Sequence, residues 1–187
     1  MASSYSTDLK LELMVTGENA GTWGDKTNTN LNLVQQAVAG YEAVSIAGGA
    51  QTTALAMSNA TLSNARNAVV KLTGTITGNQ IVTIPDGIEK VYHFVNGTSG
   101  AYTVQVKTVS GTGFTFATTD KGTRLAYADG TNLVDVNAAF TTINQFTLPS
   151  ADGTANQAIL TDGSGTLSFG DKGISTGKAI AMAIVFG

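Results

Sequence analysis

Acidic side chains are the first candidates for chemistry in this chain, because two carboxylates about 5 to 10 Å apart can cleave a glycosidic bond. Four aspartates directly precede a glycine: Asp86, Asp129, Asp152 and Asp162. Asp-Gly is typical of tight turns, so we interpret these four as turn residues. The glutamates are widely spaced: Glu12, Glu18, Glu42 and Glu89. The sequence indicates no catalytic pair, although pairing of distant carboxylates across the fold stays open.

Metal ligands are the second candidates. His93 is the only histidine, and the chain has no cysteine. A zinc site draws its ligands mainly from these two residue types, so we expect no zinc site here and interpret His93, within VYHFV, as a satisfied core or edge-strand histidine. The segment DGSGT at 162–166 begins like a calcium loop but lacks the later oxygen ligands and the final glutamate. We expect no bound metal.

A glycine-rich stretch, GISTGKA at 173–179, superficially resembles a phosphate-binding loop. Three residues separate its glycines where four are needed, and Ala179 stands where Ser or Thr would hold magnesium. We therefore expect no cofactor and no enzymatic activity.

Charge and hydropathy limit the partners. Only 12% of the residues are charged and the net charge is −3, whereas nucleic-acid binding depends on clustered Lys and Arg. We expect no nucleic-acid partner. The apolar run AIAMAIVF at 179–186 is shorter than the about 20 residues that cross a bilayer, so we expect no membrane insertion. We interpret this run as a buried strand or a strand-forming interface.

The elements that must position these residues are mostly strands. Short β-rich runs in 71–136 are separated by Gly, Asn-Gly and Asp-Gly turns at intervals of roughly 8 to 12 residues. Strands are expected at 69–73, 80–84, 90–95, 102–108, 113–117, 123–128 and 132–136. Asn96-Gly97 and the Asp-Gly pairs at 86 and 129 are expected to form hairpins or tight turns. We predict a mainly β protein whose core, at 42–138, is an antiparallel, jelly-roll-like β-sandwich.

The segment 1–41 is expected to hold one helix. Leu31, Val34, Val38 and Tyr41 recur at spacings of three and four, so they would form one apolar stripe that needs a surface to cover it. Trp23, the only tryptophan, is either a local packing anchor or an interface aromatic.

The segment 139–187 contains small apolar groups separated by turns. These are Leu148, the pair Ile159 and Leu160, and the pair Leu167 and Phe169. No such group can form a core alone, and short unpaired strands do not offset their ordering entropy. We therefore predict an extended β arm that either wraps on another surface or intertwines with its own copies, which favours an oligomer.

Several stretches resemble bacteriophage tail-fibre and appendage proteins, including marine phage and cyanophage ones. In 16–37, Gly-Thr-Trp-Gly is followed by an Asn-rich helix start, similar to the opening segment of many such proteins. LTGTITGNQIVTIP and LAYADGTNLVDV resemble a β-domain that recurs in phage fibres, LPSADGTANQAILTDGSGTLSF is similar to a fibre linker, and GKAIAMAIVFG resembles the ending of some marine phage structural proteins.

The resemblance implies a virion structural protein, a homotrimer that is assembled in the host cytoplasm. It would be a short tail fibre or appendage whose partners are its own copies and other virion proteins, with a host surface glycan as a further candidate. The expected particle-docking residues are Trp23, Asn28, Asn30, Leu31, Val34 and Val38. The expected self-association residues are Leu148, Ile159, Leu160, Leu167, Phe169, Ile184 and Phe186. Two alternatives stay open: a capsid decoration protein, and a glycan-binding module that would use Tyr92, Tyr102 or Tyr127.

Overall fold

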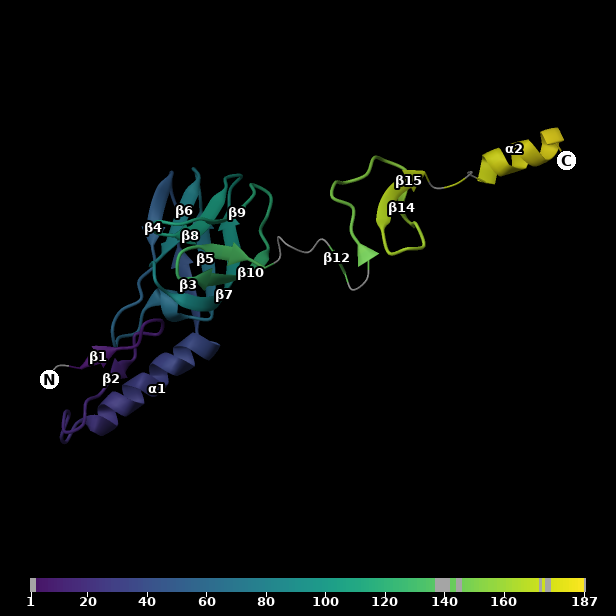
Figure 1. The fold of residues 1–187 in the computed structure, drawn as a ribbon. Coiled ribbons are helices and arrows are strands. Elements are labelled where there is room, and N and C mark those ends of the chain that lie inside the picture. Colours follow the sequence, from purple (N-terminus) through teal and green to yellow (C-terminus); the bar gives the residue numbers. More distant parts are fainter. Residues whose placement is uncertain (1–2, 137–141, 144–145, 172, 174–175, 187) are drawn as a thin grey trace. The chain divides into compact units, whose positions relative to one another are not determined.

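A computed structural model describes residues 3–136, 142–143, 146–171, 173 and 176–186. The chain divides into two compact units, Met1–Ala138 and Ala139–Gly187 (Figure 1). The described residues are mainly β, with two α-helices, α1 (Trp23–Ala39) and α2 (Thr176–Phe186). The mainly β class predicted from the sequence is confirmed.

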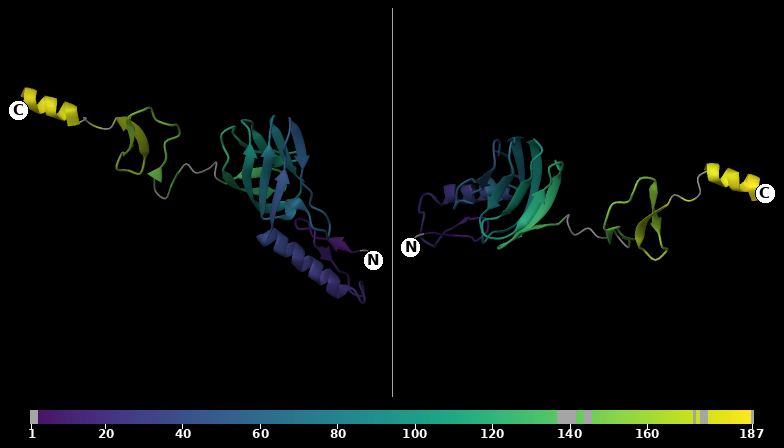
Figure 2. Two further views of the ribbon diagram at one scale, coloured as in Figure 1. Left: turned by 180° about the vertical axis from the view of Figure 1, so that it is seen from behind. Right: turned by 90° about the horizontal axis from the view of Figure 1, so that it is seen from above.

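Six consecutive strands of the first unit alternate between two sheets (Figures 1 and 2). They are β3 (Tyr41–Ser45), β4 (Gln51–Ala54), β5 (Val69–Thr75), β6 (Gln80–Ile84), β7 (Glu89–Ser99) and β8 (Val104–Thr108). Strands β3, β5 and β7 pair in parallel in one sheet, and β4, β6 and β8 pair in parallel in the other. The chain therefore winds three times between the sheets.

The last three strands of this unit reverse direction. They are β9 (Gly113–Phe116), β10 (Thr123–Asp129) and β11 (Leu133–Asp135). Strand β9 runs antiparallel to β8, β10 runs antiparallel to β7, and β11 runs antiparallel to β10. The resulting orders are β11-β10-β7-β5-β3 and β4-β6-β8-β9. The antiparallel, jelly-roll-like topology that we expected is therefore wrong, because both sheets are mixed.

The turns explain this correction. Asp129-Gly130 does close a hairpin between β10 and β11, with Ala128 opposite Leu133. Asp86-Gly87 also makes a turn, but it carries the chain from β6 in one sheet to β7 in the other. Asn96-Gly97 lies within β7 and makes no turn. Turn residues mark where a strand ends, and they do not specify which sheet the next strand joins.

The core lies between the inward faces of the two sheets. Its residues include Val70, Leu72 and Phe94 of the five-stranded sheet and Val82 and Val106 of the four-stranded sheet. Aromatic rings continue this core, with centroids 5.3 Å apart for Tyr92 and Phe94 and 6.0 Å apart for Phe94 and Phe114. Burial of each large side chain stabilises the fold by roughly 1.5–3 kcal/mol.

Helix α1 is attached to the strand pair β1 (Ser4–Tyr5) and β2 (Glu12–Leu13). The carboxamide of Asn30 accepts a hydrogen bond from Glu12 N at 2.9 Å and donates one to Glu12 O at 2.8 Å. Lys26 Nζ also lies 2.9 Å from Glu12 Oε2, and Leu33 is buried. These contacts fix one face of α1 on the N-terminal segment.

A buried arginine joins this segment to the strands β3–β11, which we call the β-unit. Arg66 ends the short helix η1 (Asn64–Arg66) and is fully buried. Its guanidinium donates to Leu9 O at 3.0 Å, Ser58 O at 2.5 Å, Thr61 O at 2.6 Å and Gln36 Oε1 at 3.2 Å. One side chain thus ties together the N-terminal segment, α1 and the loop before β5.

The second unit contains two short antiparallel pairs and α2. Strand β12 (Thr142–Ile143) pairs with β13 (Phe146–Thr147), and β14 (Gln157–Thr161) pairs with β15 (Leu167–Asp171). The expected strand at 179–186 is wrong, because this run lies in α2. The alanines and the methionine of this run favour a helix, and its apolar residues do not alternate with polar ones as in a half-buried strand. The C-terminal segment is therefore not wholly a β arm.

Candidate interaction surfaces

The acidic residues of the Asp-Gly pairs hold turns together. Asp129 Oδ1 accepts hydrogen bonds from Thr131 N at 2.9 Å and Asn132 N at 2.6 Å, and Asp162 Oδ1 does the same for Ser164 N and Thr166 N. These backbone donors lower the pKa of both carboxyl groups because they stabilise the charged form. The interpretation of Asp129 and Asp162 as turn residues is confirmed.

Other charged groups form structural ion pairs. Arg124 lies 2.7 Å from Asp120 and also pairs with Asp135, and its guanidinium carbon is 5.3 Å from the centre of the Phe116 ring. Hydrogen bonding to Arg124 lowers the pKa of Asp120, and hydrogen bonding to Lys26 lowers the pKa of Glu12. We assign these groups to packing between elements.

No cluster of three or more acidic, His or Cys side chains that could hold a metal occurs among the described residues. His93 is exposed on the outward face of β7, which is the central strand of its sheet, so the expectation of a core or edge-strand histidine is wrong. Within the described parts of the chain, no helix is both long and apolar enough to span a bilayer.

The segment 173–177 also has the spacing Gly-x-Ser-x-Gly of a nucleophile elbow. Ser175 lies outside the described residues, so the spacing carries no assignment.

The docking stripe, which we define as Trp23, Leu31, Val34 and Val38, is exposed along α1. The exposed fractions are 65% for Trp23, 62% for Leu31, 37% for Val34 and 75% for Val38. At 3.6 residues per turn, these four side chains share one face of the helix, whereas buried Leu33 lies on another. Large apolar side chains gathered on one exposed face indicate an interaction surface.

The two asparagines proposed for docking differ in their surroundings. Asn28 is exposed. The carboxamide of Asn30 is engaged by the backbone of Glu12, so it holds α1 on β2. A helical spacing can identify the apolar stripe, but it does not show that the neighbouring asparagine has a distant backbone partner.

The residues proposed for self-association are partly gathered by the β14–β15 hairpin. Ile159 stands opposite Phe169, and Leu167 follows on the same face, while Leu160 projects to the other face. Leu148, Leu167 and Phe169 line one hollow of about 530 Å³. Ile159 is 60% exposed, and Ile184 and Phe186 of α2 are 77% and 82% exposed.

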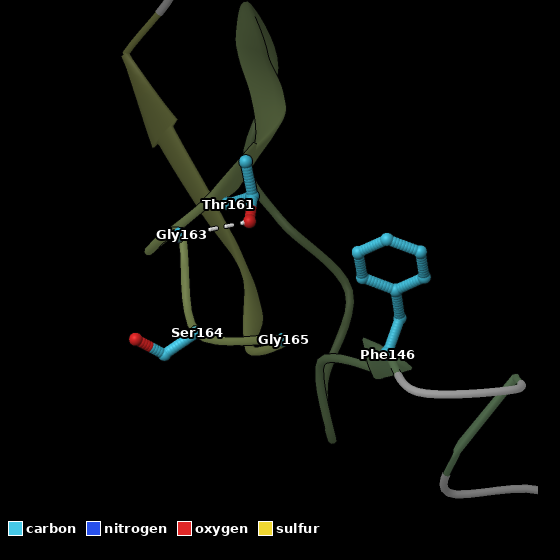
Figure 3. Close-up of a pocket in the computed structure, with 5 residues that line it drawn as sticks. All are labelled: Phe146, Thr161, Gly163, Ser164 and Gly165. Carbon is cyan, nitrogen blue, oxygen red and sulfur yellow. Dashed lines mark hydrogen bonds between the residues drawn. The ribbon is translucent and has the colours of Figure 1, made fainter.

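A second hollow of the same unit has a volume of about 450 Å³ (Figure 3). The ring of Phe146 stands on one side, and the glycine-rich turn of Gly163, Ser164 and Gly165 forms the other side. Thr161 Oγ1 accepts a hydrogen bond from Gly163 N at 3.2 Å. None of the described residues that line this hollow carries a charged side chain, and we assign no ligand to it.

A third hollow, the α1–β3 hollow, was missed by sequence reasoning. It has a volume of about 280 Å³ and is lined by side chains that include those of Asn32, Gln35, Gln36, Tyr41 and Asn67. In the sequence, the pair Gln35-Gln36 close to Tyr41 is only a weak indication of a ligand site. Asn67 is distant in the sequence and is brought to the hollow by the fold.

The tyrosines considered for glycan contact also differ. Tyr92 is fully buried and cannot contact an external glycan, whereas Tyr102 and Tyr127 are 39% and 42% exposed.

Comparisons with known proteins give no relative. No family model, no curated protein and no solved structure matches this chain.

Proposed function

We propose that this chain is a bacteriophage virion structural protein, a short tail fibre or appendage that docks on the particle through α1 and assembles as a homotrimer through 139–187. The observation that carries the proposal is that large apolar side chains are exposed on α1 and on the second unit, the two parts of the chain that precede and follow the β-core in the sequence. The resemblance of the sequence to phage fibre proteins gives these surfaces their role.

The docking stripe suits attachment because the helix that carries it, α1, is held in place by hydrogen bonds and an ion pair. Asn30 and Lys26 hold α1 on the N-terminal segment, and Arg66 ties that segment to the β-unit. A side chain on a fixed helix loses less conformational entropy on binding than one on an unattached segment. In this proposal the two sheets that share the core act as a β-sandwich spacer without chemistry of its own.

Self-association is supported by the character of α2. Isolated helices of fewer than about 12–15 residues are marginal in water, and α2 has 11 residues. Ile180, Met182, Ile184, Val185 and Phe186 are all more than half exposed. A helix that is apolar on all sides is normally buried, and copies of the same helix would bury it.

Sedimentation velocity on the full chain tests the assembly. We expect a trimer, and we expect the double variant Ile184→Lys, Phe186→Lys to sediment mostly as a monomer, because charged side chains cannot be buried without partners. Val109→Lys is the control, since Val109 is 55% exposed but lies in the other unit. A wild-type monomer at tens of micromolar would contradict the homotrimer.

An image of the intact particle at side-chain resolution tests the location. The tail proposal expects the docking stripe of α1 against a tail or appendage protein. Density for this chain on the capsid shell instead would favour the decoration alternative.

A further inference from the structure

The α1–β3 hollow presents carboxamides whose orientation is fixed by their partners. Gln36 Oε1 accepts from Arg66 Nη1 at 3.2 Å, so its amide nitrogen is the group left to donate. Asn67 Nδ2 donates to Ser63 O at 3.4 Å and to Asn64 O at 3.2 Å, which makes Asn67 Oδ1 an acceptor. The hollow thus has one oriented donor and one oriented acceptor.

Gly40 lets Asn67 pack closely against the end of α1. A Cβ atom at Gly40 would collide with Asn67 Oδ1 and with the backbone oxygen of Gln36. The exposed side chains of Asn32 and Gln35 make no hydrogen bond within residues 3–136, so both carboxamides remain available to a ligand.

Tyr41 adds an aromatic wall. It is the first residue of β3, it also lines the hollow, and it is 58% exposed. An exposed aromatic ring beside hydrogen-bonding groups offers an apolar face and a polar edge to the same ligand.

Charge excludes several ligand classes. None of the residues that line the hollow is charged. The nearby cations are already engaged, since Arg66 bonds to four oxygens and Lys90 Nζ donates to Asn67 O at 2.9 Å and to Val91 O at 3.0 Å. A phosphate or carboxylate would therefore find no free counter-ion here.

We propose that the α1–β3 hollow binds one ring of a neutral sugar. Its hydroxyls would accept from Gln36 and donate to Asn67, because a hydroxyl can do both, while the apolar face of the ring would lie on Tyr41. The hollow is close to the lower end of the volumes of ligand sites, about 300 Å³, which fits a single ring better than a chain.

This site does not depend on the proposed virion function. At 3.6 residues per turn, Asn32 and Gln36 lie on the opposite side of α1 from the docking stripe, whereas Gln35 borders the stripe, four residues after Leu31 and three before Val38. Sugar binding can therefore be measured on the soluble chain, and its failure would leave the assembly proposal untouched.

Saturation-transfer NMR on the full chain tests the site. The neutral probes are methyl α-D-glucopyranoside, methyl β-D-galactopyranoside and methyl N-acetyl-β-D-glucosaminide. We expect at least one to bind with roughly millimolar affinity. We expect Tyr41→Ala and Gln35→Leu each to weaken that binding tenfold or more. Gln35 is exposed, so its replacement should leave the fold intact.

Tyr127→Ala is the matched control, because Tyr127 is exposed on β10 outside the hollow and its loss should not change binding. Three results would overturn the proposal. One is the absence of transfer to every neutral probe at roughly 20 mM, well above a millimolar dissociation constant. Another is equal weakening by Tyr127→Ala. The third is tighter binding of glucose 6-phosphate or of acetyl-trialanine amide than of the neutral sugars.

Discussion

Lys90 is the residue whose titration should be visible in the stability of the fold. Its ammonium group donates to Asn67 O and Val91 O and lies 4.0 Å from the centre of the Tyr92 ring. Burial lowers the pKa of Lys90 to about 8, whereas a lysine in an unfolded chain has a pKa of about 10.4. Between these values the unfolded state binds more protons, so the free energy of unfolding rises with pH.

We predict that Lys90→Met removes this dependence. Relative to wild type, the variant should lose about 1 kcal/mol of the increase in unfolding free energy between pH 8 and 9.5, because the missing amine no longer releases its proton there. Urea unfolding at a series of pH values measures the difference. Lys107→Met controls for the loss of a lysine charge, since Lys107 Nζ bonds at the surface to Val109 O. Parallel profiles for wild type and Lys90→Met would contradict the prediction.

Residues of the candidate surfaces could be predicted from the sequence where the helical repeat alone decides which side chains are exposed. Leu31, Val34 and Val38 follow a helical spacing, and the structure leaves all three exposed on one face. Residues that meet through the fold were not predictable in this way. Asn67 reaches the α1–β3 hollow only because η1 packs on α1, and no spacing in the sequence encodes that contact.

At the scale of elements, Arg66 decides whether α1 stays in place. It is fully buried, and it reaches the N-terminal segment at Leu9, α1 at Gln36 and the loop before β5 at Ser58 and Thr61. Removing a buried donor leaves its acceptors without partners, and each loss costs about 1–3 kcal/mol.

We predict that Arg66→Ala lowers the free energy of unfolding by about 3–5 kcal/mol. Hydrogen exchange should also rise first in α1 and β2, because these elements lose their tie to the β-unit. Arg124→Ala is a useful comparison, since Arg124 is part-buried and its removal should not loosen α1. If Arg66→Ala left hydrogen exchange in α1 unchanged, Arg66 would not be the residue that holds α1 in place.

The positions of the strands were predictable, and their pairing was not. Strand β6 occupies 80–84 as expected, and each of the other strands predicted between 69 and 136 overlaps an observed one. Alternation of apolar residues reports which side chains face the core, and it is the same for parallel and antiparallel partners. Helix α2 was missed for a related reason, because a short run of uninterrupted apolar residues fits a buried strand or a buried helix equally well.

At the scale of the whole molecule, the two units should differ in how their stability depends on concentration. The first unit has a closed core of its own, built from both sheets. The described residues of the second unit form two short strand pairs and α2, and the apolar side chains of α2 that the structure describes are largely exposed. If copies of the second unit bury one another, its stability is coupled to assembly by mass action.

We therefore predict that hydrogen-exchange protection of α2 rises with protein concentration, while protection of β5 and β7 stays constant. In the monomer an 11-residue helix opens readily, whereas in the trimer its amides are covered by neighbouring copies. Exchange measured by mass spectrometry at about 0.5 and 50 µM should separate these states, if the dissociation constant is near 1 µM. The double variant Ile184→Lys, Phe186→Lys should stay unprotected at both concentrations. Equal protection of α2 at both concentrations in wild type, with sedimentation as a monomer, would show that α2 is stable alone and is not the element that joins the copies.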